Sequence, residues 1–101
     1  MENVTEEQVK QLQSEGKKLL VQYTAMWCSP CKALTPRLAL LSSEYPDVTF
    51  VKVDVDENMD AISELEIRSV PTIMIYNGDT LINRSTGANI DSVYRKILDT
   101  L

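Results

Sequence analysis

Two cysteines, Cys28 and Cys31, are the side chains of this sequence best suited to carry chemistry. The apolar run 19–23 precedes them and leucines repeat at helical spacing after them, which predicts a strand passing directly into a helix. Unpaired N–H groups and the positive dipole end of a helix favour a thiolate, so we expect Cys28 to be the exposed, readily ionised thiol. Cys31 should lie one turn inside, buried, on the same face. Pro30 fits the first turn, which needs no N–H, and the pair can close and reopen a small disulfide.

Three other uses of the pair stay open. A structural disulfide is one, although so short a loop removes little chain entropy. A metal site is another, but the chain has no histidine and no third cysteine, so carboxylates or a second chain would have to complete it. Two inert thiols are the third, and the helix N-terminus beside Trp27 argues against inertness. We therefore favour redox chemistry and expect no bound metal.

The composition is that of one ordinary globular domain over residues 1–101, with 44% hydrophobic and 25% charged residues. The net charge of -5 predicts no nucleic-acid partner and no anionic membrane partner, because their phosphates would repel the chain. No apolar run approaches the roughly 20 residues of a membrane span. The acidic stretch 1–7 is unlike a signal peptide, which predicts a cytoplasmic protein. In that reducing compartment a cysteine pair is usually catalytic.

Hydrophobic periodicity and turn residues predict alternating strands and helices. Thr5 and Gln8 match a capping box that begins the first helix, and Gly16 ends it. Asn77-Gly78 is the strongest hairpin signal and makes the last two strands antiparallel. The expected strands cover 1–4, 18–25, 48–55, 72–76 and 81–85. The second helix is expected to end at about Tyr45, and the third helix to cover 59–65.

Other residues predict details of these elements. Pro36 should kink the second helix, because it lacks an N–H and crowds the preceding turn. A residue of 56–58 should cap the third helix and Asn89 the fourth. The fourth helix carries an apolar stripe made of Ile90, Val93, Tyr94, Ile97, Leu98 and Leu101. The order of elements implies parallel strands joined by right-handed crossovers, in a mixed sheet with helices on both faces.

The sequence resembles the thioredoxin family. The stretch 27–32, Trp-Cys-Ser-Pro-Cys-Lys, is similar to the family's active-site signature, and the resemblance runs nearly from end to end. Later landmarks agree in order and spacing: Pro36, Val53-Asp54-Val55-Asp56, Val70-Pro71-Thr72, Asn77-Gly78-Asp79 and Thr86-Gly87-Ala88. The resemblance implies an α/β thioredoxin fold, with a central mixed sheet of four to five strands flanked by four helices.

The resemblance also implies an activity, that of a thiol–disulfide oxidoreductase that reduces protein disulfides. Cys28 would be the nucleophile that forms a mixed disulfide, and Cys31 the resolving cysteine that displaces the reduced product. No cofactor would be bound, because a flavin-dependent, NADPH-using thioredoxin reductase would restore the dithiol. Its partners would be disulfide-containing proteins and that reductase, and the chain would be a monomer with a reducing potential.

Substrate recognition is likewise implied by the resemblance. The proline that matches Pro71 is cis in thioredoxins and packs beside the cysteines, and the residue before it, here Val70, pairs with an extended substrate segment through its backbone. Trp27, Val70, Pro71 and Ala88 would form an apolar rim, with Gly87 next to it.

Several residues near the pair depart from the family pattern. Ser29 replaces a glycine, and its hydroxyl either donates to a sulfur or stiffens the loop. Thr24 replaces a common tryptophan, so one aromatic wall is missing. Gln22 replaces a buried acid and cannot act as a base, while Lys52 would lose that acid as a partner or extend to solvent. The residues expected to tune the redox pair are Trp27, Ser29, Pro30, Gln22 and Lys52.

The same departures leave a second function open. Some thioredoxins serve as subunits or clamps of larger enzymes through the apolar rim, without redox turnover. The chain could be such a binding module, since a fold by itself does not fix a function.

Overall fold

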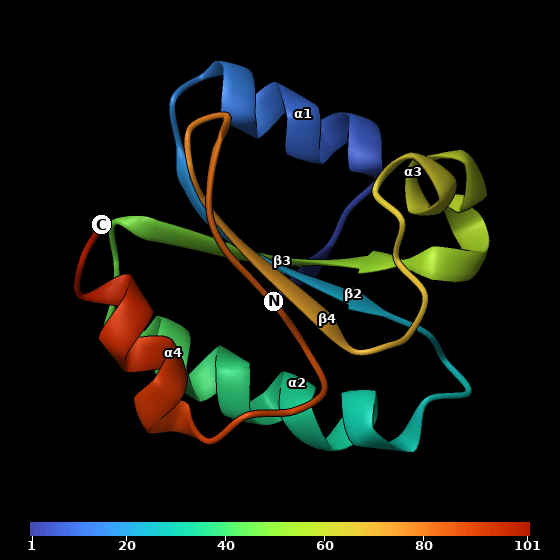
Figure 1. The fold of residues 1–101 in the computed structure, drawn as a ribbon. Coiled ribbons are helices and arrows are strands. Elements are labelled where there is room, and N and C mark those ends of the chain that lie inside the picture. The colour runs from blue at the N-terminus through green and yellow to red at the C-terminus, as the bar shows by residue number, and fades with distance from the viewer.

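The computed structural model describes all residues, 1–101, and contains five strands and four helices around one sheet (Figure 1). The strands are β1 (Glu2–Asn3), β2 (Lys18–Thr24), β3 (Val48–Asp54), β4 (Thr72–Asn77) and β5 (Thr80–Thr86). The helices are α1 (Glu6–Ser14), α2 (Ser29–Ser42), α3 (Met59–Glu64) and α4 (Asp91–Leu98), and a 3₁₀ turn covers Val55–Glu57.

The sheet has the order β1-β3-β2-β4-β5. β1 and β2 both pair with β3 in parallel, whereas β4 is antiparallel to β2 and to β5. α1 and α3 cover one face of the sheet, and α2 and α4 cover the other (Figure 1). The predicted mixed sheet, its edge strand at the N-terminus and its antiparallel final hairpin are therefore confirmed.

α1 begins with the predicted capping box. The Thr5 hydroxyl accepts a hydrogen bond from the Gln8 N–H at 3.1 Å, and the Gln8 side chain accepts one from the Thr5 N–H at 2.9 Å. These two bonds satisfy donors that a helix start would otherwise leave free. Gly16 follows the helix with φ of 75°, a conformation that favours glycine, so the chain turns there into β2.

Asn58 occupies the N-cap position of α3, within the predicted stretch 56–58, but makes no capping bond there, and the predicted Asn89 cap of α4 is wrong. The side chain of Asn58 does not cap α3; it accepts a bond from the Glu6 N–H at 3.0 Å and donates to the Asp54 carbonyl at 2.8 Å. α4 begins one residue later than expected, with Ile90 at its N-cap position and no side-chain cap. The Asn58 side chain thus meets tertiary partners that helix periodicity does not reveal, whereas the Asn89 side chain makes no hydrogen bond.

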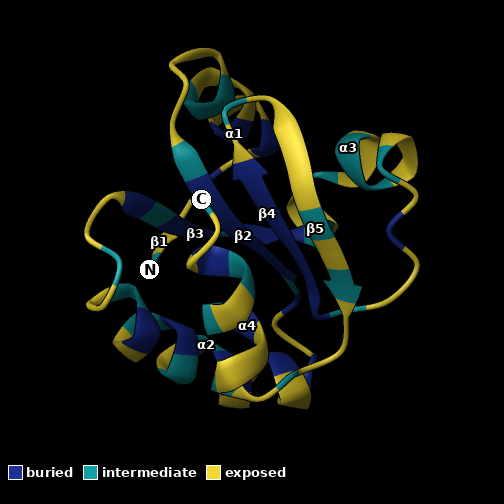
Figure 2. Ribbon diagram, turned by 60° about the vertical axis from the view of Figure 1, so that its left-hand side comes forward, coloured by how far each residue is buried: buried dark blue, intermediate teal, exposed yellow.

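Two hydrophobic clusters pack against opposite faces of the sheet. β2 and β4 are buried along most of their length, whereas the edge strand β5 is largely exposed (Figure 2). Tyr94 and Leu98 bring α4 into the core, but Ile90 is 67% exposed because it precedes the helix and so leaves the helical stripe. α2 likewise ends at Ser42 rather than Tyr45, and its leucines face the sheet. Pro36 lies inside α2, and the kink expected there stays a prediction.

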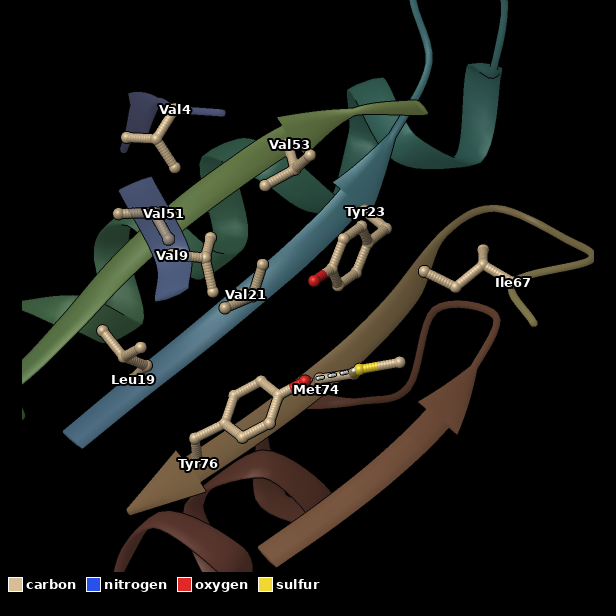
Figure 3. Close-up of a cluster of buried hydrophobic side chains, with 10 residues drawn as sticks. All are labelled: Val4, Val9, Leu19, Val21, Tyr23, Val51, Val53, Ile67, Met74 and Tyr76. Atoms are coloured by element: carbon tan, nitrogen blue, oxygen red, sulfur yellow. Dashed lines mark hydrogen bonds between the residues drawn. The ribbon is translucent and has the colours of Figure 1, made fainter. Parts of the chain in front are cut away.

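The cluster beneath α1 and α3 contains buried polar groups (Figure 3). The Tyr23 hydroxyl donates to the Glu6 carboxylate at 2.5 Å, and the Tyr76 hydroxyl lies 3.0 Å from the Met74 sulfur. Burial raises the pKa of Glu6 above its ordinary value, and burial raises that of Tyr23 as well. This pair joins the first turn of α1 to the central strand.

None of the helices has the length and apolar character needed to cross a bilayer.

Candidate active site

Cys28 occupies the N-cap position of α2, immediately after the turn that follows β2, as the sequence predicts. Its backbone is extended, with φ of -92° and ψ of 104°, and its Sγ accepts a hydrogen bond from the Cys31 N–H at 3.2 Å. Ser29 and Pro30 form the beginning of the helix, where proline costs no hydrogen bond. The two cysteines are joined in a disulfide. The helix start thus presents a backbone donor to the sulfur that would carry negative charge after reduction.

The expectation that Cys28 is exposed is wrong for this disulfide state. Cys28 is only 4% exposed and Cys31 is fully buried. The pair packs with Ala25 and is covered by Val55 and Val70, which explains the low exposure of Cys28. Cys28 is nevertheless the more exposed of the two residues, in keeping with its position at the helix start.

The Val70–Pro71 peptide bond is cis and lies against the cysteine pair. The Val70 carbonyl oxygen is 3.7 Å from the Cys28 Sγ, and the Val70 N–H has no hydrogen-bond partner within the chain. The Pro71 carbonyl accepts the Gly87 N–H at 2.8 Å, which holds the exposed Gly87 and Ala88 next to this segment. A free N–H beside the reactive sulfur is a group that an extended segment can pair with.

The apolar rim differs in part from the expected one. Trp27 is 68% exposed, and its indole N–H donates to the Asp56 carboxylate at 2.9 Å. Pro71 is buried, so it shapes the site from beneath rather than forming the surface. A groove of about 110 Å³ opens beside Trp27. The sequence did not predict this groove, because its lining residues come from separate segments, α3 among them, that only the fold brings together. Its lining residues are Trp27, Val55, Ile62, Ile67, Arg68, Ser69 and Val70.

Gln22 lies fully buried below the cysteines, as expected from its match to a buried acid. Its amide nitrogen donates to the Cys31 carbonyl at 3.3 Å, and its amide oxygen accepts from the Thr35 hydroxyl at 3.0 Å. Thr24, two residues along β2, makes no hydrogen bond to this amide. Sequence reasoning missed Thr35, although its spacing of four residues from Cys31 on one helix places the two on the same face.

Lys52 is the residue of β3 paired in register with Gln22. It forms no ion pair, and its half-buried side chain lines an open pocket of about 420 Å³ together with Thr24, Lys32 and Thr35. Ser29 is exposed, and its hydroxyl donates to neither sulfur in this disulfide state. No group of three Asp, Glu, Cys or His side chains is placed to hold a metal ion.

The geometry supports thiol–disulfide exchange. The pair lies at a helix start with a free backbone N–H alongside, and Cys28 is slightly exposed while Cys31 is fully buried. As a disulfide it can accept two electrons from a dithiol, and as a dithiol it can pass them to another disulfide.

Comparisons with known proteins agree with this chemistry. The thioredoxin family model matches residues 1–99. The chain is 39% identical to the mitochondrial Thioredoxin-3 of Saccharomyces cerevisiae, in an alignment that covers 96% of this chain and 75% of the yeast protein. It is also 39% identical to the thioredoxin of Mycoplasmoides gallisepticum, over 86% of this chain and 88% of that protein. The crystal structure of oxidised mitochondrial thioredoxin 3 from Saccharomyces cerevisiae superposes with a TM-score of 0.86 at 36% identity. The match covers 98% of this chain and 94% of the yeast chain. The X-ray structure of Fasciola hepatica thioredoxin is 30% identical, with a TM-score of 0.87 and 98% of each chain covered. The chain therefore belongs to the thioredoxin family, and it is a thiol–disulfide oxidoreductase with protein-disulfide reductase activity.

Proposed function

We propose that Cys28 is the nucleophile and Cys31 the resolving cysteine of this reductase. The Cys28 thiolate attacks a substrate disulfide, forms a mixed disulfide and releases the first substrate sulfur as a thiolate, which takes up a proton. Cys31 then loses its proton to solvent and attacks the Cys28 sulfur, so that the second substrate sulfur leaves and is protonated. Two electrons pass from the dithiol to the substrate, and the Cys28–Cys31 disulfide is the oxidised product.

The position of Cys28 carries this assignment. Its Sγ lies at the start of α2, receives the Cys31 N–H and faces the Val70 carbonyl. The free N–H of Val70 supports recognition of an extended substrate segment through its main chain. The exposed Trp27 lines a groove with Val70, and the exposed Ala88 follows Gly87, which bonds to Pro71. Such recognition requires little of the substrate's sequence, which suits a reductase of many proteins.

The electron source, oligomeric state and location are proposals as well. We propose that a flavin-dependent thioredoxin reductase using NADPH restores the dithiol, which makes the chain an electron carrier in cell redox homeostasis. The chain would act as a monomer, which analytical ultracentrifugation can test. A cytoplasmic location stays a prediction, to be tested by fractionation of the source cells.

Disulfide reduction in insulin, followed with and without a thioredoxin reductase and NADPH, tests the proposal. The parent protein should turn over only with the reductase present. Cys28→Ser should abolish reduction, whereas Cys31→Ser should trap the mixed disulfide. Turnover by Cys28→Ser would overturn the assignment.

The binding-module function is favoured by one observation, the neutral Gln22 in place of an acid beneath the cysteines. If the chain acts only by binding through its apolar rim, the Cys28→Ser variant should bind the partner as tightly as the parent protein does. A partner captured by both proteins, together with no insulin reduction by the parent, would establish this alternative.

A further inference from the structure

Thr35 joins Gln22 to the backbone of the buried cysteine. Its hydroxyl lies 3.0 Å from the Gln22 amide oxygen and 2.9 Å from the Cys31 carbonyl oxygen. A threonine hydroxyl has one proton, so it donates to only one of these acceptors at a time.

The orientation of the Gln22 amide decides which acceptor receives that proton. The Gln22 nitrogen is 3.3 Å from the Cys31 carbonyl and donates to it. With the amide reversed, its oxygen would face that carbonyl oxygen, and two acceptors would repel each other. With the amide as it stands, its buried oxygen depends on the Thr35 proton.

We propose that Thr35 is a positioning residue for the resolving step of thiol–disulfide exchange. By fixing the Gln22 amide, it keeps the Cys31 carbonyl bonded to β2 and holds the first turn of α2 in place. The Cys31 sulfur then stays within reach of Cys28 while the mixed disulfide exists and the Cys28–Cys31 bond is open. This proposal rests on the assignment of Cys31 as the resolving cysteine.

The location of Thr35 supports an effect on that step alone. It lies one helical turn beyond Cys31 and lines the pocket that Lys52 also lines, and its hydroxyl makes no hydrogen bond to Cys28 or to the Val70 segment. Attack by Cys28 on a substrate therefore uses none of its bonds. Closure of the Cys28–Cys31 bond, in contrast, depends on the position of the Cys31 backbone, which Thr35 helps to hold.

Reaction of the reduced protein with 5,5′-dithiobis(2-nitrobenzoate) separates the two steps. Attack by Cys28 releases one nitrothiobenzoate at a rate proportional to reagent concentration. Resolution by Cys31 releases the second at a rate independent of it. Thr35→Val, which removes the hydroxyl with little change of shape, should slow the second release about five- to tenfold, the effect of one lost hydrogen bond, and leave the first unchanged. Thr35→Ser should restore the parent rate.

Control variants separate this proposal from the one on which it rests. Cys31→Ser should abolish the second release; if it does not, the role of Cys31 fails whatever Thr35 does. Thr24→Val, a change on the same pocket wall without a bond to Gln22, should alter neither rate. In a Gln22→Leu background, Thr35→Val should have no further effect.

Three results would overturn the role of Thr35: an unchanged second release in Thr35→Val, equal slowing of both releases, or no rescue by Thr35→Ser. If Thr35→Val does not fold, the same comparison between Thr35→Ala and Thr35→Ser decides the question.

Discussion

Gln22 shows how one buried residue couples stability to chemistry. Its amide is fully enclosed, and both of its polar atoms are bonded. A carboxylate in that place would lose its hydration with too few donors around it, whereas a neutral amide avoids most of that cost. The chain therefore has a well-satisfied polar group under its cysteines, but no base there.

Gln22→Asp should lower the free energy of unfolding by roughly 1–3 kcal/mol at neutral pH, because it buries a poorly compensated group. It should also speed resolution of the mixed disulfide, since a base would then lie near Cys31. The neighbouring Lys52 reduces the stability loss if it pairs with the new carboxylate. Denaturant melts and single-turnover reduction between about pH 6 and 9 measure both effects. Gln22→Asn is the matched neutral control; an Asp variant as stable as the parent and no faster would contradict the prediction.

Cys28 and Cys31 should differ in reactivity once the disulfide is reduced. Cys28 lies at the helix start and is 4% exposed, whereas Cys31 is fully buried, so iodoacetamide near neutral pH should label Cys28 first. Peptide mapping of the labelled protein gives the ratio directly. Preferential labelling of Cys31 would reverse the roles proposed for the two sulfurs.

At the scale of elements, α1 is tied to the sheet by a titratable group. Burial raises the pKa of Glu6, while the hydrogen bond from Tyr23 and the charge of Lys10 oppose that shift. The folded protein therefore holds the Glu6 proton more tightly than the unfolded chain does. Stability from this group is complete below the unfolded pKa and is lost as pH rises through the folded pKa.

Glu6→Gln should remove that loss, because an amide does not titrate. The difference in unfolding free energy between Glu6→Gln and the parent should thus move in favour of the variant as pH rises from the ordinary Glu range. Urea melts at a series of pH values measure this difference. Glu7→Gln, an exposed change in the same helical turn, is the matched control. A flat difference for Glu6→Gln would show that Glu6 has the same pKa in both states.

The two asparagines near helix starts make a further test at this scale. Asn58 bonds to α1 and to the end of β3, so Asn58→Ala should cost about 1–3 kcal/mol of unfolding free energy. The Asn89 side chain makes no hydrogen bond, so Asn89→Ala should cost less than about 0.5 kcal/mol. Thermal or denaturant unfolding of both variants decides; a larger loss for Asn89→Ala would restore it as a cap.

For the whole molecule, the redox potential expresses the balance between dithiol and disulfide states. The established reference value for thioredoxin is about -270 mV, against about -120 mV for a strong oxidant. We expect this chain to lie near the thioredoxin value, with a shift of about 30 mV unsurprising because Ser29 replaces a glycine. Equilibration with glutathione buffers measures the potential. A potential more oxidising than roughly -200 mV would place the chain in another functional class.

The sequence alone determined the order of elements, the helix start at Cys28 and the chemistry of the pair. Those features are local: apolar periodicity, a capping box at Thr5 and an Asn-Gly turn act over a few residues, so the sequence reports them directly. The cis bond at Pro71 was expected only from the family resemblance, since most such bonds are trans.

Only the tertiary structure decided the partners of buried polar groups. Thr35 bonds to Gln22, the Asn58 side chain bonds to α1 instead of capping α3, and Cys28 is covered by Val55 and Val70. Each of the contacts of Gln22, Asn58 and Cys28 joins segments distant in sequence, and its geometry depends on how the helices pack on the sheet. A polar side chain bonds to whatever donor or acceptor that packing brings within about 3 Å, which no local pattern encodes.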